Sequence, residues 1–450
     1  MPSSNLPSSN PKGYEVAVVG GGPAGSAAAI TLAQRGRSVV LLERARFPRF
    51  HIGESLLATA NERFAELGLT EIVRAAGFPP KWGASLSTFD GASERSVDFA
   101  AAPDVRTPQT WQVGRAKFDA LVLERARAAG ADVREGCRVS AVELAPDGVT
   151  LELQCDDGSN RGSQPDRLKV AALIDATGRD GLLAKRLALR KDEPRLANVA
   201  IYAHYAGVPR LEENRSGDIR IVARADAGWF WLIPIEDDLT SVGVVLPKAL
   251  YLSFEKGEPE EMLRRAIADT PAVAKLMKGA RREWPVRVER DFSYASSAYA
   301  GDRWLLAGDA GSFLDPVFST GVSIALESGI EAATALDRAL ARGELRRKGF
   351  AAFERIQRRR FESFRRFVLA FYTPWFRDLF FSPGAPPLLF EAVVTVLAGN
   401  WRPRIRTRLL IRAFFACVAF QRLVPFAPKL VGRGRDAGYP IDEPATESPG

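Results

Sequence analysis

Cysteine and histidine are scarce in this chain. Its 450 residues include three cysteines (Cys137, Cys155 and Cys417) and two histidines (His51 and His204). Three widely spaced cysteines predict neither a disulfide framework nor a metal site, and they fit a reducing, cytoplasmic setting. Two histidines leave little basis for a metal centre or a Ser-His-Asp triad. We therefore expect no metal and a chemistry that a bound cofactor supplies.

Long apolar stretches are also missing. No run of 18 or more uncharged apolar residues occurs, so no transmembrane segment is expected. Residues 1–13 are polar, lack the apolar core of a signal peptide and are predicted to form a disordered lead. The acidic, proline-containing residues 436–450 are predicted to form a disordered tail.

The net charge of +8 is spread unevenly. Residues 341–450 hold 20 Lys and Arg against 9 Asp and Glu, whereas the first 340 residues have a balance of −3. The basic surplus therefore belongs to the C-terminal region, and no nucleic-acid-binding surface is expected. A chain of 450 residues also exceeds the usual size of one hydrophobic core, so several domains are expected.

A strand, a glycine turn, a helix and a second strand follow one another near the N-terminus. Residues 15–19 and 38–42 are predicted strands, and the helix between them runs to about Arg35. The Gly-x-Gly-x-x-Gly turn permits a tight bend, admits a pyrophosphate against bare backbone and aims a helix N-terminus at it. The acidic residue that ends the second strand is placed to accept hydrogen bonds from the ribose hydroxyls. The predicted dinucleotide site comprises Gly20, Gly22, Ala24, Gly25, Glu43 and Arg44.

Two later apolar runs are predicted strands of the same domain. Residues 168–174 are expected to form one buried strand that ends in Asp175-Ala176-Thr177-Gly178, and residues 304–307 another that ends in Gly308-Asp309-Ala310. Both strand ends, and the segment Gln112–Arg115 with Asp119, resemble the segments by which aromatic-hydroxylase-type flavoproteins hold FAD. The resemblance implies FAD, with contacts from Arg115, Asp175, Gly308 and Asp309. An ion pair between Arg115 and Asp119 on one helix turn is the alternative.

Three further segments resemble the signatures of flavin-dependent halogenases. Residues 229–234 match Trp-x-Trp-x-Ile-Pro, and residues 313–321 match Phe-x-x-Pro-x-x-Ser-x-Gly. Lys81 lies in a Lys-x-Gly-Ala segment like that of members acting on phenolic or carrier-bound substrates. On residue types alone, these segments also fit a core strand, a helix entry and a surface lysine.

This resemblance assigns roles to individual residues. It implies that Lys81 is catalytic and directs hypohalous acid by a hydrogen bond or through its own neutral, halogenated amine, which requires burial or nearby positive charge. Backbone N–H groups at a helix start can hold an anion, and the implied halide site is Ser319, Thr320 and Gly321. Gly53, Ser55, Pro316 and Gly321 are expected beside the flavin, and Trp229, Trp231, Pro234, Phe313 and Phe318 are expected to shield flavin or substrate.

One position departs from the tryptophan-specific members of that family. They carry a glutamate directly before Ser-Thr-Gly, where this chain has Phe318. The resemblance therefore implies an electron-rich ring such as a phenol or pyrrole as the expected substrate in place of tryptophan, since a phenol stabilises the intermediate cation through its own oxygen.

The predicted fold class is α/β. Alternation of apolar residues between positions 219 and 244 predicts an antiparallel sheet, and phenylalanines at helical spacing from 350 to 371 predict a helix. The predicted domains are a Rossmann-like FAD-binding domain (14–78, 108–190 and 285–340), an inserted antiparallel-sheet substrate domain (79–107 and 191–284) and a helical C-terminal cap (341–435).

The cap also predicts a partner. Residues 371–381 and 397–403 resemble the cap of halogenases with tethered substrates, and Arg402, Arg404, Arg406 and Arg408 are placed to attract an acidic acyl or peptidyl carrier protein. A solvated helix face and peripheral membrane contact are the alternatives.

Taken together, the resemblance implies an FAD-dependent oxidoreductase of secondary metabolism, such as antibiotic biosynthesis. Reduced FAD from a separate flavin reductase, dioxygen, and chloride or bromide would give hypohalous acid. An aromatic monooxygenase, an isoprenoid double-bond reductase and a non-catalytic flavoprotein scaffold remain alternative interpretations.

Overall fold

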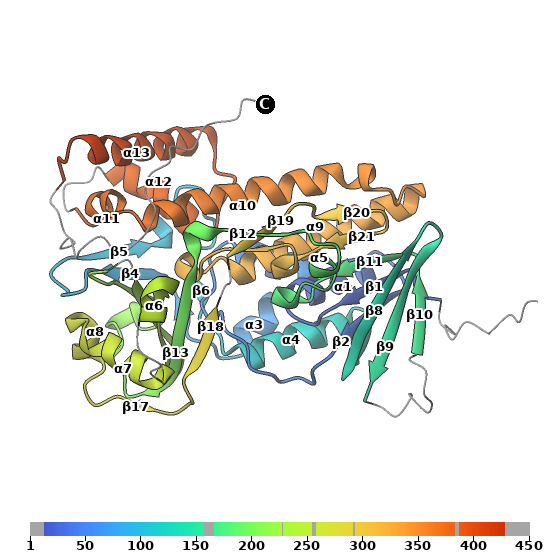
Figure 1. The fold of residues 1–450 in the computed structure, drawn as a ribbon, viewed down its shortest axis with the longest axis horizontal. Coiled ribbons are helices and arrows are strands. Elements are labelled where there is room, and N and C mark those ends of the chain that lie inside the picture. Colours follow the sequence, from blue (N-terminus) through green and yellow to red (C-terminus); the bar gives the residue numbers. More distant parts are fainter. Residues whose placement is uncertain are drawn as a thin grey trace, which may run out of the picture.

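The computed structural model describes residues 13–156, 166–226, 228–253, 258–290, 293–382 and 387–427. The predicted tail 436–450 and the predicted lead, except Gly13, lie outside the described residues. The fold is mixed α/β, as predicted. A parallel sheet with its helices lies next to a larger sheet, and C-terminal helices gather beside the larger sheet (Figure 1).

A six-stranded sheet has the order β20-β21-β11-β1-β2-β7 and is parallel except for β20–β21. Val16 and Val18 of β1 pack with the helices α1, α4 and α9, while Ala17 and Val19 pack with the three-stranded sheet β8–β10. Both faces are covered, which explains why β1 is apolar at every position. The bounds are β1 Val16–Val19, β2 Val39–Glu43, β7 Asp132–Glu135, β8 Cys137–Ala145, β9 Gly148–Cys155, β10 Asp166–Val170, β11 Ala172–Asp175, β20 Ala300–Gly301, β21 Trp304–Leu306, α1 Pro23–Gln34, α2 Ala60–Leu67, α3 Thr70–Ala75, α4 Arg115–Ala128, α5 Leu182–Arg186 and α9 Gly321–Arg342.

The apolar run at residues 168–174 belongs to two strands, so the prediction of one strand was wrong. β10 pairs antiparallel with β9, whereas β11 pairs parallel with β1 and β21. Ala171 stands between them and donates its N–H to the Glu15 carbonyl at 2.9 Å. The chain passes from one layer to the next at this single residue, and hydrophobic periodicity has no signal for such a step because both strands are apolar.

The structure joins Cys137 and Cys155 in a disulfide, which contradicts the expectation that the cysteines form none. The two residues lie directly opposite each other in the register of β8 and β9. They are 18 residues apart in sequence, and the hairpin brings their Cα atoms to 4.0 Å. Spacing along the chain could not reveal this pairing, because it depends on strand register. Cys417 is free.

The larger sheet has the order β17-β13-β16-β15-β14-β4-β5, with β18 also paired to β13. It is antiparallel as predicted, except that β14 and β4 run parallel. Along β15, Trp229 and Trp231 pack into the cluster that the C-terminal helices share, and Phe230 packs on the other face with α7 and α8. The bounds are β4 Gly83–Ser87, β5 Glu94–Asp98, β13 Asn198–Ala206, β14 Ile219–Ala223, β15 Trp229–Glu236, β16 Leu239–Pro247, β17 Arg281–Arg282, β18 Arg287–Arg290, α6 Lys248–Ser253, α7 Pro259–Ala268 and α8 Pro271–Leu276.

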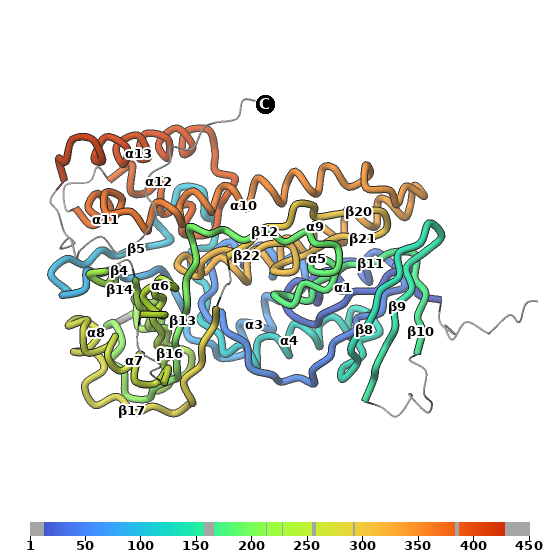
Figure 2. The backbone as a smooth tube through the Cα atoms, in the orientation of Figure 1, coloured from blue at the N-terminus to red at the C-terminus, as the bar shows by residue number. Residues whose placement is uncertain are grey.

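The C-terminal region is helical. The long α10 runs beside α9, and α11, α12 and α13 gather at the end of the molecule opposite β8–β10 (Figures 1 and 2). None of the described helices is long and apolar enough to cross a membrane. The bounds are α10 Ala351–Phe371, α11 Pro374–Phe381, α12 Pro387–Leu397 and α13 Ile405–Leu423, and the short strands are β3 Pro80–Lys81, β6 Thr110–Trp111, β12 Arg190–Asp192, β19 Tyr294–Ser296 and β22 Ser312–Phe313.

The disulfide can be tested by alkylating denatured protein that was purified without reductant. We expect one modified thiol, that of Cys417, before reduction and three after it, read by mass spectrometry. Modification of all three cysteines before reduction would contradict the pairing of Cys137 with Cys155.

Candidate flavin and halide site

A cavity of about 840 Å³ is lined by the glycine turn before α1, the end of β2, the start of α9 and β15 of the larger sheet. It brings together most of the residues that the sequence singled out. Those that line it are Gly20, Gly22, Ala24, Glu43, Arg44, Gly53, Ser55, Arg115, Trp229, Trp231, Asp309, Phe313, Pro316, Ser319, Thr320 and Gly321.

The glycines of the turn have different environments. A Cβ added to Gly20, whose φ is +104°, would lie 2.3 Å from the Ala176 carbonyl oxygen, and one added to Gly25 would lie 1.8 Å from the Gly20 carbonyl oxygen. A Cβ on Gly22 would meet only a guanidinium nitrogen of Arg49, at 3.6 Å. Gly20 and Gly25 are therefore required by backbone packing, whereas Gly22 leaves open space in front of the N-terminus of α1.

Glu43 is buried and held in one orientation. Its Oε2 accepts the Gly21 N–H at 2.6 Å, and its Oε1 accepts the Ala45 N–H at 2.8 Å. A carboxylate oxygen can accept a second hydrogen bond, so this side chain can still accept hydrogen bonds from ribose hydroxyls.

Arg115 both forms the ion pair with Asp119 and lines the cavity, so the two interpretations of this residue are compatible. Its Nε and Nη2 donate to the two carboxylate oxygens of Asp119 at 2.7 and 2.9 Å, and its Nη1 donates to the Ile52 carbonyl at 2.7 Å. The same residue lines the cavity. Arg49, which the sequence reasoning left without a role, also pairs with Asp119 at 3.2 Å and lines the cavity. The sequence offered one indication of a role for Arg49, namely its position in the loop after the second strand.

These features fit FAD. The cavity has the size of a large cofactor, the turn and helix N-terminus suit a pyrophosphate, and Arg49 places a cation beside Gly22. Burial raises the pKa of Asp309 to about 6, while Arg115 and Arg179 act in the opposite direction. The hydrogen-bonding groups and positive charge therefore lie where a diphosphate and its sugar hydroxyls would need them.

The loop before α9 forms the opposite wall of the cavity. Asp315 accepts the Val317 N–H at 3.1 Å, and Ser319 adopts a left-handed conformation (φ +55°) that turns the chain into the helix. Thr320 is the N-cap residue of α9, and both it and Gly321 line the cavity. The first N–H groups of a helix have no partner within it, so this end of α9 can hold a small anion.

A buried hydrogen-bonded junction supports that loop from behind. The Tyr372 hydroxyl donates to Asp315 Oδ2 at 2.6 Å and accepts from Trp229 Nε1 at 2.9 Å and from Asn198 Nδ2 at 3.0 Å. Burial raises the pKa of Asp315 to about 6, and its hydrogen bonds from Tyr372 and Asn198 oppose that rise. Sequence reasoning missed the junction, since its members are spread from residue 198 to residue 372.

Lys81 is buried, with 1% of its surface exposed. Its Nζ donates to Ser55 Oγ and to the Leu56 carbonyl, both at 2.8 Å, and lies 5.1 Å from the centre of the Phe99 ring. Burial lowers the pKa of Lys81 to about 7, although Asp218 acts to raise it. Lys81 is not among the cavity-lining residues, but Ser55 is. The amine therefore lies directly behind the cavity wall.

The remaining predicted residues lie outside the cavity lining. Gly25 packs against Gly20, and the Asp175 carboxylate accepts backbone N–H groups of Thr177 and Leu183 at 3.0 and 2.7 Å. A Cβ on Gly308 would lie 2.9 Å from that of Ala24. Pro234 is buried in β15, and Phe318 contacts Phe371 of α10 edge to face. The contacts of these five residues are with neighbouring protein atoms, so they support the walls of the cavity from outside its lining.

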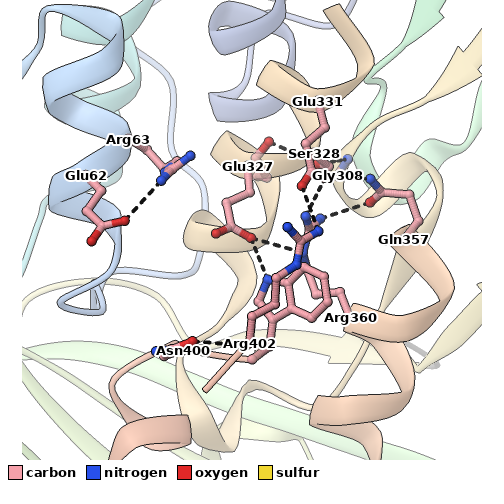
Figure 3. A network of polar contacts seen from close by, with 12 residues as sticks. Glu62, Arg63, Gly308, Glu327, Ser328, Glu331, Gln357, Arg360, Asn400 and Arg402 are labelled. Carbon is pink, nitrogen blue, oxygen red and sulfur yellow. Dashed lines mark hydrogen bonds and ion pairs between the residues drawn. The ribbon is translucent and has the colours of Figure 1, made fainter. Parts of the chain in front are cut away.

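A second polar network, absent from the sequence reasoning, links α10 to α9 (Figure 3). The Arg360 guanidinium pairs with Glu327 at 3.0 Å and with Glu331, and it donates to Gln357 at 3.0 Å. Trp401 Nε1 also donates to Glu327 at 3.0 Å. Arg360 and Gln357 line the cavity, so this network fixes the edge of the cavity nearest the cap.

The fold and the cavity define an FAD-dependent oxidoreductase, and comparison with known proteins identifies its family. The family model described as tryptophan halogenase matches residues 15–101 and 90–378. A 1H-pyrrole-2-carbonyl-[peptidyl-carrier protein] brominase from Pseudoalteromonas luteoviolacea is 34% identical over 73% of this chain and 78% of its own length. The corresponding chlorinase from Pseudomonas fluorescens is 31% identical over 80% of this chain and 83% of its own.

A solved structure agrees with this assignment. The flavin-dependent halogenase CmlS superposes with a TM-score of 0.75 and 31% identity over 90% of this chain and 70% of its own. The chain belongs to the tryptophan halogenase family of flavin-dependent halogenases, which act with reduced FAD, dioxygen and halide.

Two glycine substitutions should separate folding from cofactor binding. Gly22→Ala places a methyl group in the open space before α1, so we expect an unchanged melting temperature without flavin and FAD binding at least about tenfold weaker. Gly25→Ala meets backbone instead and should destabilise the flavin-free protein by about 1–3 kcal/mol or more. Flavin fluorescence titration and thermal unfolding measure both effects. Unchanged FAD affinity in Gly22→Ala would contradict the assignment of this space to the pyrophosphate.

The buried amine predicts a specific pH dependence of stability. The pKa of Lys81 is about 7 in the folded protein against an ordinary 10.5, so between these values the unfolded chain binds a proton that the folded protein does not. The free energy of unfolding should therefore gain about 1.4 kcal/mol per pH unit from this residue as pH rises through the window. Lys81→Met should lose that gain, while Lys117→Met, at an exposed position, should keep it. Parallel denaturation midpoints for wild type and Lys81→Met across the window would contradict the burial of a neutral amine.

Proposed function

We propose that this protein halogenates an electron-rich aromatic ring, a pyrrole or a phenol, carried on an acyl or peptidyl carrier protein. The observation that carries the proposal is the buried Lys81, whose amine contacts Ser55 in the wall of the flavin cavity. A carboxylate in direct contact would hold the lysine protonated, whereas its partners are a hydroxyl and a carbonyl. The amine is therefore able to exchange a proton near neutral pH.

Bound FAD, once reduced, would supply two electrons that bring dioxygen to the peroxide level, and this oxidant would convert halide to hypohalous acid with release of water. The chain's own residues position the reactants. We assign the halide to Ser319, Thr320 and Gly321, where the N-terminal N–H groups of α9 favour an anion. Trp229 and Trp231, both almost fully buried, exclude water from the same cavity.

Lys81 then acts on the substrate side of Ser55. Its protonated form donates a hydrogen bond to the oxygen of hypohalous acid, and its neutral form is a nucleophile that can itself accept the halogen. Either route confines a diffusible oxidant to the substrate. We assign cofactor contacts to Gly20, Gly22, Ala24, Glu43, Arg44, Gly53, Arg115, Asp309 and Pro316, and shielding of the flavin to Phe313.

The substrate class rests on two observations. The relatives named above act on pyrrole-2-carbonyl groups attached to a peptidyl-carrier protein. In this chain Phe318 stands before the halide site and packs against Phe371, within the apolar cluster that also contains Phe99 near Lys81. An apolar wall without a carboxylate favours a ring that stabilises its own positive charge.

We further propose a cytoplasmic enzyme of secondary metabolism that receives reduced FAD from a separate flavin reductase. The Cys137–Cys155 disulfide removes the cysteine count as support for a cytoplasmic setting. The proposal rests instead on the reduced nicotinamide that such a reductase consumes, which is made in the cytoplasm. We retain the three predicted domains as functional units: one that binds FAD, one that presents β15 to it, and a cap that covers the substrate side.

A mass-spectrometric assay tests the proposal with purified protein, FAD, a flavin reductase, NADH, oxygen, and chloride or bromide. Substrates are carrier-tethered and free pyrroles and phenols. Wild type should give a product with the halogen isotope pattern, and Lys81→Met should lower its rate by at least about 100-fold. Lys117→Met, which alters an exposed lysine, is the matched control and should keep full activity.

Other outcomes would overturn the proposal. A hydroxylated product that forms without halide would show a monooxygenase. Halogenation at the wild-type rate by Lys81→Met would remove the lysine from the mechanism, even with the family assignment intact.

A further inference from the structure

A second cavity, of about 280 Å³, lies on the surface where the cap meets the loop after β5. We call it the arginine pocket. It shares no lining residue with the flavin cavity. Its lining residues are Glu62, Pro103, Asp104, Val105, Arg106, Asn400, Arg402 and Arg404.

Two arginines of the pocket keep donors available for a ligand. Asp104 pairs with Arg404 at 3.3 Å, and Glu62 pairs with Arg63 outside the pocket at 3.1 Å. Arg402 is 3.7 Å from its nearest carboxylate oxygen, on Glu331, which is too long for a hydrogen bond. No ion pair joins Arg106 to any residue in the described part of the chain. Two such guanidiniums suit a phosphate, which accepts paired N–H donors.

The pocket walls are fixed. The Arg402 N–H donates to Asn400 Oδ1 at 2.9 Å, which shapes the turn, and Thr407 Oγ1 donates to Asp104 Oδ2 at 3.0 Å. Figure 3 shows Asn400 and Arg402 next to the network of Arg360. The arginines are thus presented on a supported turn, which reduces the entropy lost on binding.

Two chain segments lead from the pocket to Lys81. Phe99, whose ring faces the Lys81 amine, is six residues before Val105 of the pocket. Leu56, which accepts a hydrogen bond from the same amine, is six residues before Glu62 of the pocket. Six extended residues span at most about 20 Å, and both segments include helical turns that shorten them. The pocket therefore lies within about 20 Å of Phe99 and Leu56, the two residues that contact the lysine amine.

We propose that the arginine pocket binds the phosphate of a phosphopantetheine arm, which carries the aromatic group from the carrier protein inward to Lys81. This inference rests on the proposed function. Leu57, Ala58 and Ala102 belong to the same buried apolar cluster as Phe99, so the protein between the pocket and Lys81 offers apolar side chains to the aliphatic part of the arm. Phe99 is buried in this cluster and Val105 packs against it, so their side chains must move apart for the arm to pass.

The surface next to the pocket fits an acidic carrier protein. Residues 401–427, which include α13, contain six arginines and no Asp or Glu. Ile405 and Leu409 are 69% and 57% exposed between Arg404, Arg406 and Arg408. Basic residues around exposed aliphatic side chains complement an acidic helix with an apolar centre.

The test compares wild type with Arg106→Ala/Arg402→Ala, and with Arg186→Ala/Arg342→Ala as the control, since these exposed arginines lie outside both cavities. Calorimetric titration uses 4′-phosphopantetheine, pantetheine without phosphate, and inorganic phosphate. Wild type should prefer phosphopantetheine over both others. The pocket variant should lose at least about tenfold of that affinity and bind pantetheine as before, and the control should match wild type.

Turnover gives the second readout. The pocket variant should raise the KM for a carrier-tethered substrate at least about tenfold and leave kcat unchanged, because Arg106 and Arg402 do not touch the reacting atoms. Equal wild-type affinity for phosphopantetheine and pantetheine, or for phosphopantetheine and inorganic phosphate, would overturn the inference. So would an unchanged KM in the pocket variant.

Failure of the proposed function would look different. If wild type binds phosphopantetheine through the two arginines but halogenates only free substrates, the tethered-substrate proposal fails while the phosphate site stands. If wild type halogenates tethered substrate and the pocket variant does so with the same KM, the arginine pocket fails and the proposed function stands.

Discussion

The hydrogen-bonded junction at Tyr372 joins the end of α10 to β13, to β15 and to the loop before α9. One hydroxyl from the end of α10 contacts Asp315 of the loop, Trp229 of β15 and Asn198 of β13. All four side chains are buried, so each polar group depends on the others for its partners. Loss of a single member would leave buried polar atoms unpaired at a cost of about 1–3 kcal/mol each. The same hydroxyl therefore fixes the positions of both the Asp315 loop and the Trp229 indole.

That junction explains how the C-terminal helices, of which α10 lines the cavity, can affect the shape of its opposite wall. The loop it supports ends at Ser319 in a left-handed conformation and leads directly into α9. The ion pairs between Arg360 and the glutamates Glu327 and Glu331 fix α9 two to three turns after its start. Lys81 benefits from the same rigidity, since the segment that accepts its hydrogen bonds also contacts the cap through Thr59 and Ala398. Burial then lowers its pKa without a neighbouring cation.

Local signals predicted much of this arrangement. The glycine turn, the β1–α1–β2 unit, the start of α9 and the Trp-x-Trp strand are each contiguous in sequence, and backbone geometry requires particular residue types at fixed spacing. The role proposed for Lys81 rests on a family resemblance, and its burial could not be deduced from its neighbours in sequence. Contacts between segments that are distant in sequence were missed as well, because neighbours in sequence do not determine them. The pairing of Cys137 with Cys155, the step between layers at Ala171 and the junction at Tyr372 all depend on register or packing.

We propose that halide is oxidised in the flavin cavity and that the halogen is transferred to the substrate behind the cavity wall, at Lys81. The most direct test measures where the oxidant goes in Lys81→Met, with a small soluble halogen scavenger present beside the substrate and with flavin reduction monitored. In wild type the substrate should be halogenated and the scavenger left largely intact. In Lys81→Met the scavenger should be halogenated in proportion to the NADH consumed, while the substrate is not. Substrate halogenation that persists in Lys81→Met, or a complete loss of halide oxidation, would contradict this division of the two steps.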